Sequence, residues 1–186
     1  MIKLVLLLQL ILAGSLAAQT QVSLGDKVPN FTAVDQEGSK WVLKKQLKTA
    51  RYLVIYFYPA AFTGGCTKQA CAYRDQKGEL EKLGAGVAGV SGDRQKTLAL
   101  FALEHGLNFT LLADEEGELA DLFGVPRKKG GMIQREVKGQ NLDLERGATI
   151  QRWTFILDEK GTLIYMDTEV NAGEDSSKVV ALLSSI

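Results

Sequence analysis

The sequence predicts an α/β fold in which a mixed central sheet is flanked by helices. Strand-like apolar runs alternate with helical segments over residues 52–123, and this alternation is typical of a sheet covered by helices. A hairpin pattern over residues 153–166 and a last helical segment follow, which adds antiparallel strands to the sheet. The chain has 186 residues, of which 46% are hydrophobic, and this suffices for one domain with a single sizeable core.

The first part of the domain carries the strongest strand and the longest helix. Residues 30–43 predict a short hairpin. Residues 52–58 form a near-continuous β-branched and aromatic run, which predicts a strand buried on both faces, and Pro59 ends it. A helix is expected from about 65 to 83, with Thr63 near its start and Gly84 just beyond its end, where a left-handed residue is favoured.

The second part continues the alternation and closes with a helix. The expected elements are, in order, strand 87–91, helix 93–105, strand 109–113, helix 116–123, an irregular charged stretch over 124–149, strands 153–157 and 162–166, and helix 174–183. Asp93 is expected to cap the helix that it begins. This order of strands and helices is that of a thioredoxin-like fold.

The first residues differ in composition from the rest of the chain. A lysine precedes an apolar run over residues 4–12, and small residues follow, which is the pattern of a signal peptide cleaved after Ala17 or one residue later. The sequence therefore predicts a signal peptide over 1–17, a mature domain over 22–186 and export to the periplasm or the extracellular space. No later segment is apolar for long enough to span a membrane, so we expect no membrane partner.

The overall charge and the metal-ligating residue types exclude several function classes. The chain has 22 basic and 22 acidic residues, so no net field points to nucleic acid as a partner. It has one histidine and two cysteines, which is too few for a structural zinc set, and we predict no metal. We expect no cofactor.

The most informative segment places Cys66 in the first turn of a helix that follows a buried strand directly. Unpaired backbone N–H groups and the positive end of the helix dipole favour a thiolate at that position. A thiolate can displace the distal oxygen of a peroxide and become a sulfenic acid. Gly64 and Gly65 have no β-carbons and leave room for a small substrate at the sulfur.

Cys71 lies five residues further along the same predicted helix. On a regular helix this spacing separates the two Cα atoms by about 8.6 Å, whereas a disulfide needs backbone movement above about 7 Å. A bond between Cys66 and Cys71 therefore requires the helix to unwind locally. From the residues alone, Cys71 is either a partner for oxidised Cys66 or a buried core thiol.

The pattern Pro59-x-x-x-Thr63-x-x-Cys66 resembles the active-site signature of the peroxiredoxins, and Cys71 resembles the second cysteine of the peroxiredoxin Q or bacterioferritin comigratory protein group. Residues 24–31, Gly124–Val125 and the segment 152–158 are also similar to that family, so the resemblance covers nearly the whole mature chain.

The resemblance implies a thiol peroxidase that acts on hydroperoxides. Cys66 would be the nucleophile and Cys71 the resolving cysteine within the same chain, with a thioredoxin-like or other thiol reductant as partner. Thr63 and Arg152 would hydrogen-bond the peroxide oxygens and the thiolate, and Pro59 would shield the sulfur. Because Cys71 resolves within the chain, we expect a monomer.

Two other functions remain open at this point. A thioredoxin-like disulfide carrier is the nearest alternative, although such carriers place only two residues between their cysteines. A non-catalytic module with a permanent Cys66–Cys71 disulfide is the other, although so short a loop removes little entropy from the unfolded chain.

Overall fold

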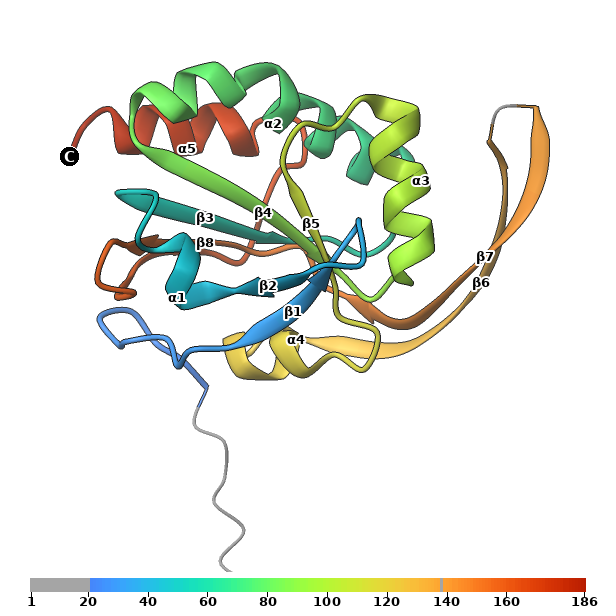
Figure 1. The fold of residues 1–186 in the computed structure, drawn as a ribbon, viewed down its shortest axis with the longest axis horizontal. Helices are drawn as coiled ribbons and strands as arrows, with labels where there is room; N and C mark the ends of the chain where they lie inside the picture. The colour runs from blue at the N-terminus through green and yellow to red at the C-terminus, as the bar shows by residue number, and fades with distance from the viewer. Residues whose placement is uncertain (1–20, 138) are drawn as a thin grey trace, which may run out of the picture.

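The computed structural model describes residues 21–137 and 139–186 as one α/β domain (Figure 1). The predicted signal peptide, 1–17, lies outside the described residues. The central sheet contains β1 (Thr32–Asp35), β2 (Lys40–Val42), β3 (Tyr52–Phe57), β4 (Ala85–Ser91), β5 (Thr110–Ala113), β8 (Thr154–Asp158) and β9 (Leu163–Asp167). The helices are α1 (Leu43–Gln46), α2 (Gly64–Lys82), α3 (Gln95–His105), α4 (Glu118–Phe123) and α5 (Asp175–Leu183).

The sheet is mixed, as predicted, and its strands lie in the order β2-β1-β5-β4-β3-β8-β9. The three central strands β3, β4 and β5 are parallel, whereas β8 pairs with β3 and β1 pairs with β5 in antiparallel register. All six residues of β3 are buried. This agrees with the predicted strand at 52–58, because a central strand covered on both faces needs apolar side chains in both directions.

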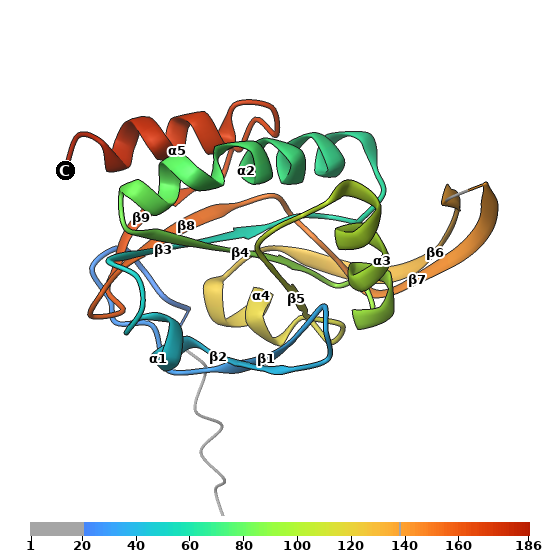
Figure 2. The same cartoon turned by 45° about the horizontal axis from the view of Figure 1, so that its top comes forward.

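Alternate side chains of β3 enter two separate cores. Tyr52, Val54 and Tyr56 pack with side chains of α2, α3 and α5 on one face. Leu53, Ile55 and Phe57 pack with α4 and the base of β7 on the other face. Figure 2 shows the same two layers, with α2 and α5 above the sheet and α4 and α1 below it.

The predicted helix ends agree with the structure in two places and disagree in one. Gly84 and Gly106 have positive φ angles of 74° and 58° at the ends of α2 and α3, where L side chains are disfavoured. The prediction that Asp93 caps its helix is wrong, because the N-cap residue of α3 is Arg94. Asp93 is instead buried, and its carboxylate accepts bonds from the Ala61 N–H and the Ser91 hydroxyl.

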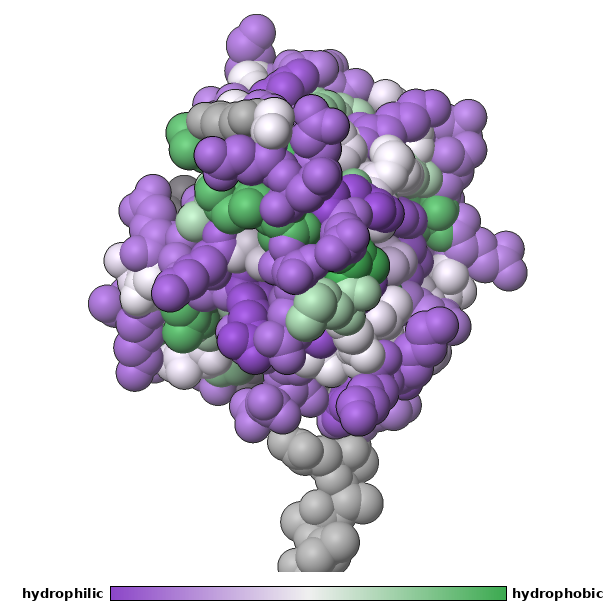
Figure 3. Space-filling model, turned by 90° about the vertical axis from the view of Figure 1, so that its right-hand side faces the viewer, coloured by the Kyte–Doolittle hydropathy of each residue, from purple (hydrophilic) through white to green (hydrophobic). Residues whose placement is uncertain are grey.

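The irregular stretch predicted over 124–149 is also wrong. These residues form a long antiparallel hairpin of β6 (Arg127–Val137) and β7 (Gln140–Ile150), which curves away from the body beside α3 (Figure 1). This ribbon tolerates many charges because most of its side chains meet water, and in β6 only Val137 is buried. Figure 3 shows mostly hydrophilic side chains on this side of the molecule, with hydrophobic ones in small separate groups.

Backbone contacts fix the base of the hairpin to the body. The Gly147 N–H donates to the Gly92 carbonyl at 2.9 Å. A β-carbon on Gly92 would lie 2.1 Å from the Ala148 carbonyl oxygen, so only glycine permits this approach. Within the described residues, no helix combines the length and apolar character needed to cross a membrane.

Candidate active site

Cys66 lies where the sequence places it, in the first turn of α2 and directly after the loop that leaves β3. Its side chain is buried, with 2% of its surface exposed. Thr63 is the N-cap residue of α2 and has extended backbone angles, and the first turn contains no acidic residue. The positive end of the helix dipole therefore acts on the sulfur without a neighbouring carboxylate in that turn to oppose it.

Arg152 supplies the fixed cation beside this sulfur. It comes just before β8, which pairs with β3, and the Phe57 N–H donates to the Trp153 carbonyl at 2.8 Å. This pairing brings the end of β3 and the start of β8 together under the helix. The Nη2 of Arg152 donates to Cys66 Sγ at 3.2 Å. A guanidinium in this position stabilises negative charge on the sulfur.

A second acceptor holds the other side of the guanidinium. The Nη1 of Arg152 donates to Oε1 of Gln69, which lies one turn after Cys66 on α2 and is fully buried. The Nε2 of Gln69 in turn donates to Asp175 Oδ2 at 2.7 Å. Gln69 was missed by reasoning from the sequence, although its spacing of three from Cys66 places both side chains on one helix face.

Thr63 and Pro59 lie on the loop between β3 and α2. The hydroxyl of Thr63 donates to the Ala60 carbonyl at 2.9 Å, so its own proton is already used. Toward any other partner, the hydroxyl oxygen of Thr63 can therefore act only as an acceptor. Pro59 is half-buried and lines a groove together with Pro126, Lys128 and Gln151.

Contacts with Asp93, Phe101 and the hairpin hold the rest of this loop in place. The buried Asp93 carboxylate accepts the Ala61 N–H at 2.7 Å. Phe62 has a φ of 59°, unusual for a residue other than glycine, and its ring packs edge-on against Phe101. Arg135 of the hairpin donates from Nε to the Phe62 carbonyl at 3.2 Å, so the hairpin contacts the rim of the site.

His105 also contacts Phe62, with ring centroids 5.9 Å apart. Loss of solvent on burial lowers the pKa of His105 from its usual value. Burial therefore favours the neutral form of the imidazole that packs beside Phe62.

Cys71 is half-buried on α2 and, like Cys66, is a free thiol in this structure. Both cysteines belong to the continuous helix Gly64–Lys82, so the structure shows the reduced arrangement. Arg74 lies one turn beyond Cys71 and donates from Nη1 to the His105 carbonyl at 2.5 Å. Its pKa is raised mainly by the hydrogen bond to Asp75, and the Cys71 thiol adds to this.

The structure thus brings Cys66 and Arg152 into direct contact and places Thr63 and Pro59 on the loop at the start of the same helix. Over residues 21–137 and 139–186, no group of three or more cysteine, histidine, aspartate or glutamate side chains could hold a metal ion. The site therefore consists of a buried thiol with an arginine side chain next to it.

Comparison with known proteins agrees with this chemistry. The model of the AhpC/TSA family matches residues 24–166. A putative peroxiredoxin, bcp, of Haemophilus influenzae is 36% identical over 165 residues, which are 89% of this chain and 98% of that protein. The chloroplastic peroxiredoxin Q of Triticum aestivum is 39% identical over 146 residues, which are 78% of this chain and 59% of that protein.

Solved structures of this group share the fold. Peroxidoxin BcpB from Mycobacterium tuberculosis superposes with a TM-score of 0.72 at 31% identity, covering 88% of this chain and 97% of that one. Peroxiredoxin Q of Xanthomonas campestris gives a TM-score of 0.67 at 26% identity, covering 83% of this chain and 90% of that one. The chain therefore belongs to the AhpC/TSA family and is a thiol-dependent peroxidase of the peroxiredoxin Q and bacterioferritin comigratory protein group.

Proposed function

We propose that Cys66 is the nucleophile that reduces hydrogen peroxide and organic hydroperoxides. The thiolate attacks the distal oxygen and the O–O bond breaks. The departing hydroxide or alkoxide takes up a proton and leaves as water or an alcohol. Cys66 becomes a sulfenic acid. The observation that carries this assignment is the 3.2 Å contact between Arg152 Nη2 and Cys66 Sγ at the start of α2.

The neighbouring residues support this step in three ways. Arg152 stabilises the thiolate and the negative charge that develops on the peroxide oxygens. Thr63 accepts the peroxide O–H, because its own proton is donated to the Ala60 carbonyl. Pro59 shields the sulfur on the side of the loop.

Cys71 then resolves the sulfenic acid. Its thiol displaces hydroxide from the Cys66 sulfur, water is released, and an intramolecular disulfide forms. A regular helix holds the two Cα atoms about 8.6 Å apart, so the helix between them unwinds before the bond closes. A thioredoxin-like or other thiol reductant supplies the two electrons that restore both thiols.

The chain is proposed to act as an exported monomer. The signal pattern over residues 1–17 supports export. Both cysteines lie on one chain, so resolution needs no partner subunit. Expression of the full chain in a bacterium should yield an exported protein that begins at Ala18 or Gln19, and an intact product in the cytoplasm would refute export.

The activity is tested with the reduced mature protein and its Cys66→Ser and Cys71→Ser variants. Each is mixed with one equivalent of hydrogen peroxide, and peroxide loss is followed together with the masses of the products. We expect rapid loss that requires Cys66, an intramolecular disulfide in the parent and a trappable sulfenic acid in Cys71→Ser. Slow loss that is indifferent to Cys66 would overturn the assignment and favour a disulfide carrier.

A further inference from the structure

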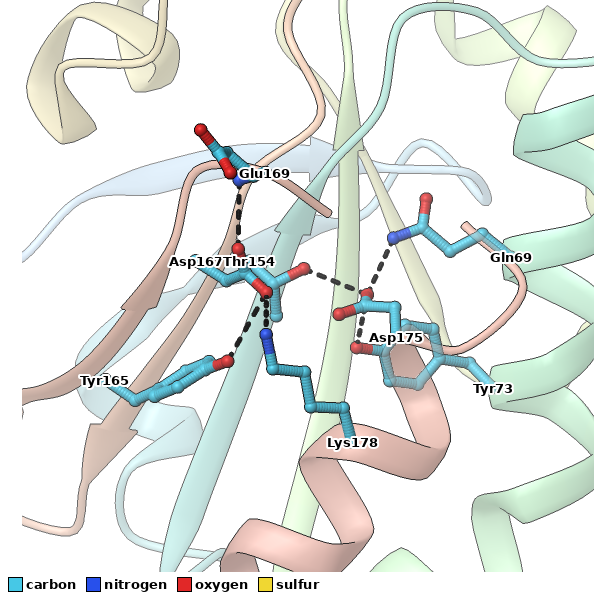
Figure 4. A network of polar contacts seen from close by, with 8 residues as sticks. All are labelled: Gln69, Tyr73, Thr154, Tyr165, Asp167, Glu169, Asp175 and Lys178. Carbon is cyan, nitrogen blue, oxygen red and sulfur yellow. Dashed lines mark hydrogen bonds and ion pairs between the residues drawn. The ribbon is translucent and has the colours of Figure 1, made fainter. Parts of the chain in front are cut away.

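Asp175 is a buried carboxylate for which the reaction described above has no role. It is the first residue of α5 and only 2% exposed. Its Oδ2 accepts three hydrogen bonds, from Gln69 Nε2 at 2.7 Å, Tyr73 Oη at 2.7 Å and Thr154 Oγ1 at 2.9 Å. Figure 4 shows the three donors converging on this oxygen from α2 and β8. A carboxylate is rarely buried so deeply, and here three donors offset its lost hydration.

The first consequence concerns the direction of the Gln69 amide. An amide has one acceptor end and one donor end, and the two are interchangeable in shape. Arg152 can only donate, so it needs the Oε1 end of the amide. Asp175 accepts from the Nε2 end and thereby turns Oε1 toward Arg152. The carboxylate thus selects the amide orientation that holds the guanidinium against Cys66 Sγ.

The second consequence concerns the helix between the two cysteines. Gln69 lies between Cys66 and Cys71, in the segment that must unwind for the disulfide to form. Its bond to Asp175 fastens this segment to α5, and unwinding has to break that bond. Tyr73 binds the same oxygen from the next turn of α2, beyond Cys71, and holds the rest of the helix in place.

We propose that Asp175 is a positioning residue with opposite effects on the two steps of the reaction: through Gln69 it orients Arg152 for attack on the peroxide, and it restrains the turn that unwinds for resolution. The proposal rests on the proposed roles of Cys66 and Cys71. Burial raises the pKa of Asp175 while its hydrogen bonds oppose that shift, as expected for an acceptor enclosed in the protein.

The test is a single-turnover experiment on the reduced mature protein with one equivalent of hydrogen peroxide. Peroxide loss gives the second-order rate constant of sulfenic acid formation. Samples are quenched with a thiol-blocking reagent, and mass spectrometry of the intact protein then gives the first-order rate constant of disulfide formation. We expect Asp175→Ala to slow the first step about tenfold, by analogy with loss of a hydrogen bond to a charged group. We expect it to speed the second step by about tenfold as well, because the Gln69–Asp175 bond that unwinding breaks is also made to a charged group.

Two further variants separate positioning from loss of stability. Asp167 on β9 forms an ion pair at 2.6 Å with Lys178, which lies on α5 together with Asp175. Asp167→Asn removes this ion pair without touching Gln69, so it should leave both rate constants unchanged. Gln69→Glu sets two carboxylates against each other and should slow the peroxide step. Combining it with Asp175→Asn supplies an amide donor opposite the new acid and should restore at least half of the lost rate.

The outcomes are distinguishable. If the parent shows no Cys66-dependent peroxide loss, the proposed function fails. If the parent is active but Asp175→Ala changes both rate constants in the same direction, or neither, the role of Asp175 is refuted alone. If Asp175→Ala does not fold, the decision passes to the pair of Gln69 variants, where failure of the double variant to recover activity refutes the proposal.

Discussion

Substituting Lys68 by glycine tests whether the α2 turn between the two cysteines must unwind before the disulfide forms. Lys68 is exposed and lies between Cys66 and Cys71 in the continuous helix. A regular helix keeps the two Cα atoms about 8.6 Å apart, which is beyond the reach of about 7 Å for a disulfide. A residue that weakens the helix at this position should therefore favour the unwound state that closes the bond.

The size of the effect follows from helix propensity. Glycine is less favourable than lysine in a helix interior by roughly 0.7 kcal/mol, which changes the ratio of unwound to helical forms by about threefold. Disulfide formation should accelerate by about the same factor if unwinding precedes it. The peroxide step should stay unchanged, because Cys66 keeps its contact with Arg152.

Glu79→Gly is the matched control for this experiment. Glu79 is also exposed and also lies in α2, but two turns beyond Cys71. Both variants should lose similar free energy of unfolding, measured by urea titration, whereas only Lys68→Gly should accelerate the disulfide, measured by quenched intact mass. Equal acceleration in both variants, or an oxidised crystal structure with residues 66–71 bonded and still helical, would refute the unwinding argument.

Arg152, Asp93 and Gly92 each allow a further test. Arg152→Lys should slow peroxide loss by about 10- to 150-fold. The ammonium group cannot bond Cys66 Sγ and Gln69 Oε1 together as the guanidinium does, and loss of one charged hydrogen bond costs about 1.5–3 kcal/mol. An unchanged rate in stopped-flow measurements would show that Arg152 has no role in the step at Cys66. Burial raises the pKa of Asp93 above its ordinary 3.8, so the folded protein binds this proton more tightly than the unfolded chain does. The free energy of unfolding should therefore fall as pH rises from 3.8 through the raised pKa. Urea titrations at several pH values should show a smaller fall in Asp93→Asn, and an identical dependence on pH would contradict this. Gly92→Ala forces a β-carbon to within 2.1 Å of a backbone carbonyl oxygen and should cost about 1–3 kcal/mol in thermal denaturation, whereas Gly131→Ala, which meets nothing within 4 Å, should cost far less.

The parts of the fold that were predictable are those with local signals. The run over β3 predicts its burial because every residue in it is aliphatic or aromatic. Glycine at positions 84 and 106 marks helix ends because only glycine readily adopts positive φ. The hairpin of β6 and β7 was missed because its glycines and charges are equally typical of a loop. Its strands are paired by register, which composition does not reveal.

In the candidate site, too, only the residues with a local signal could be predicted from the sequence. The position of Cys66 at a helix start follows from the strand and the glycines around it. The proximity of Arg152 came from the family resemblance, since nothing in the spacing of 86 residues indicates a contact. Gln69 and Asp175 are 106 residues apart and meet only because α5 packs against α2 in the finished fold. No local pattern in the sequence marks such a pair.

The long hairpin has a consequence for how this protein behaves at high concentration. In the part of the chain that the structure describes, β6 and β7 pair only with each other, apart from one bridge between Asp93 and Arg146. Their outer edges therefore offer free N–H and C=O groups to a strand of another molecule, which is a route to aggregation. Exposed Lys128 and Lys129 on β6 oppose it, because two such edges would repel each other on approach. The charges that obscured this hairpin in the sequence thus help keep neighbouring molecules apart.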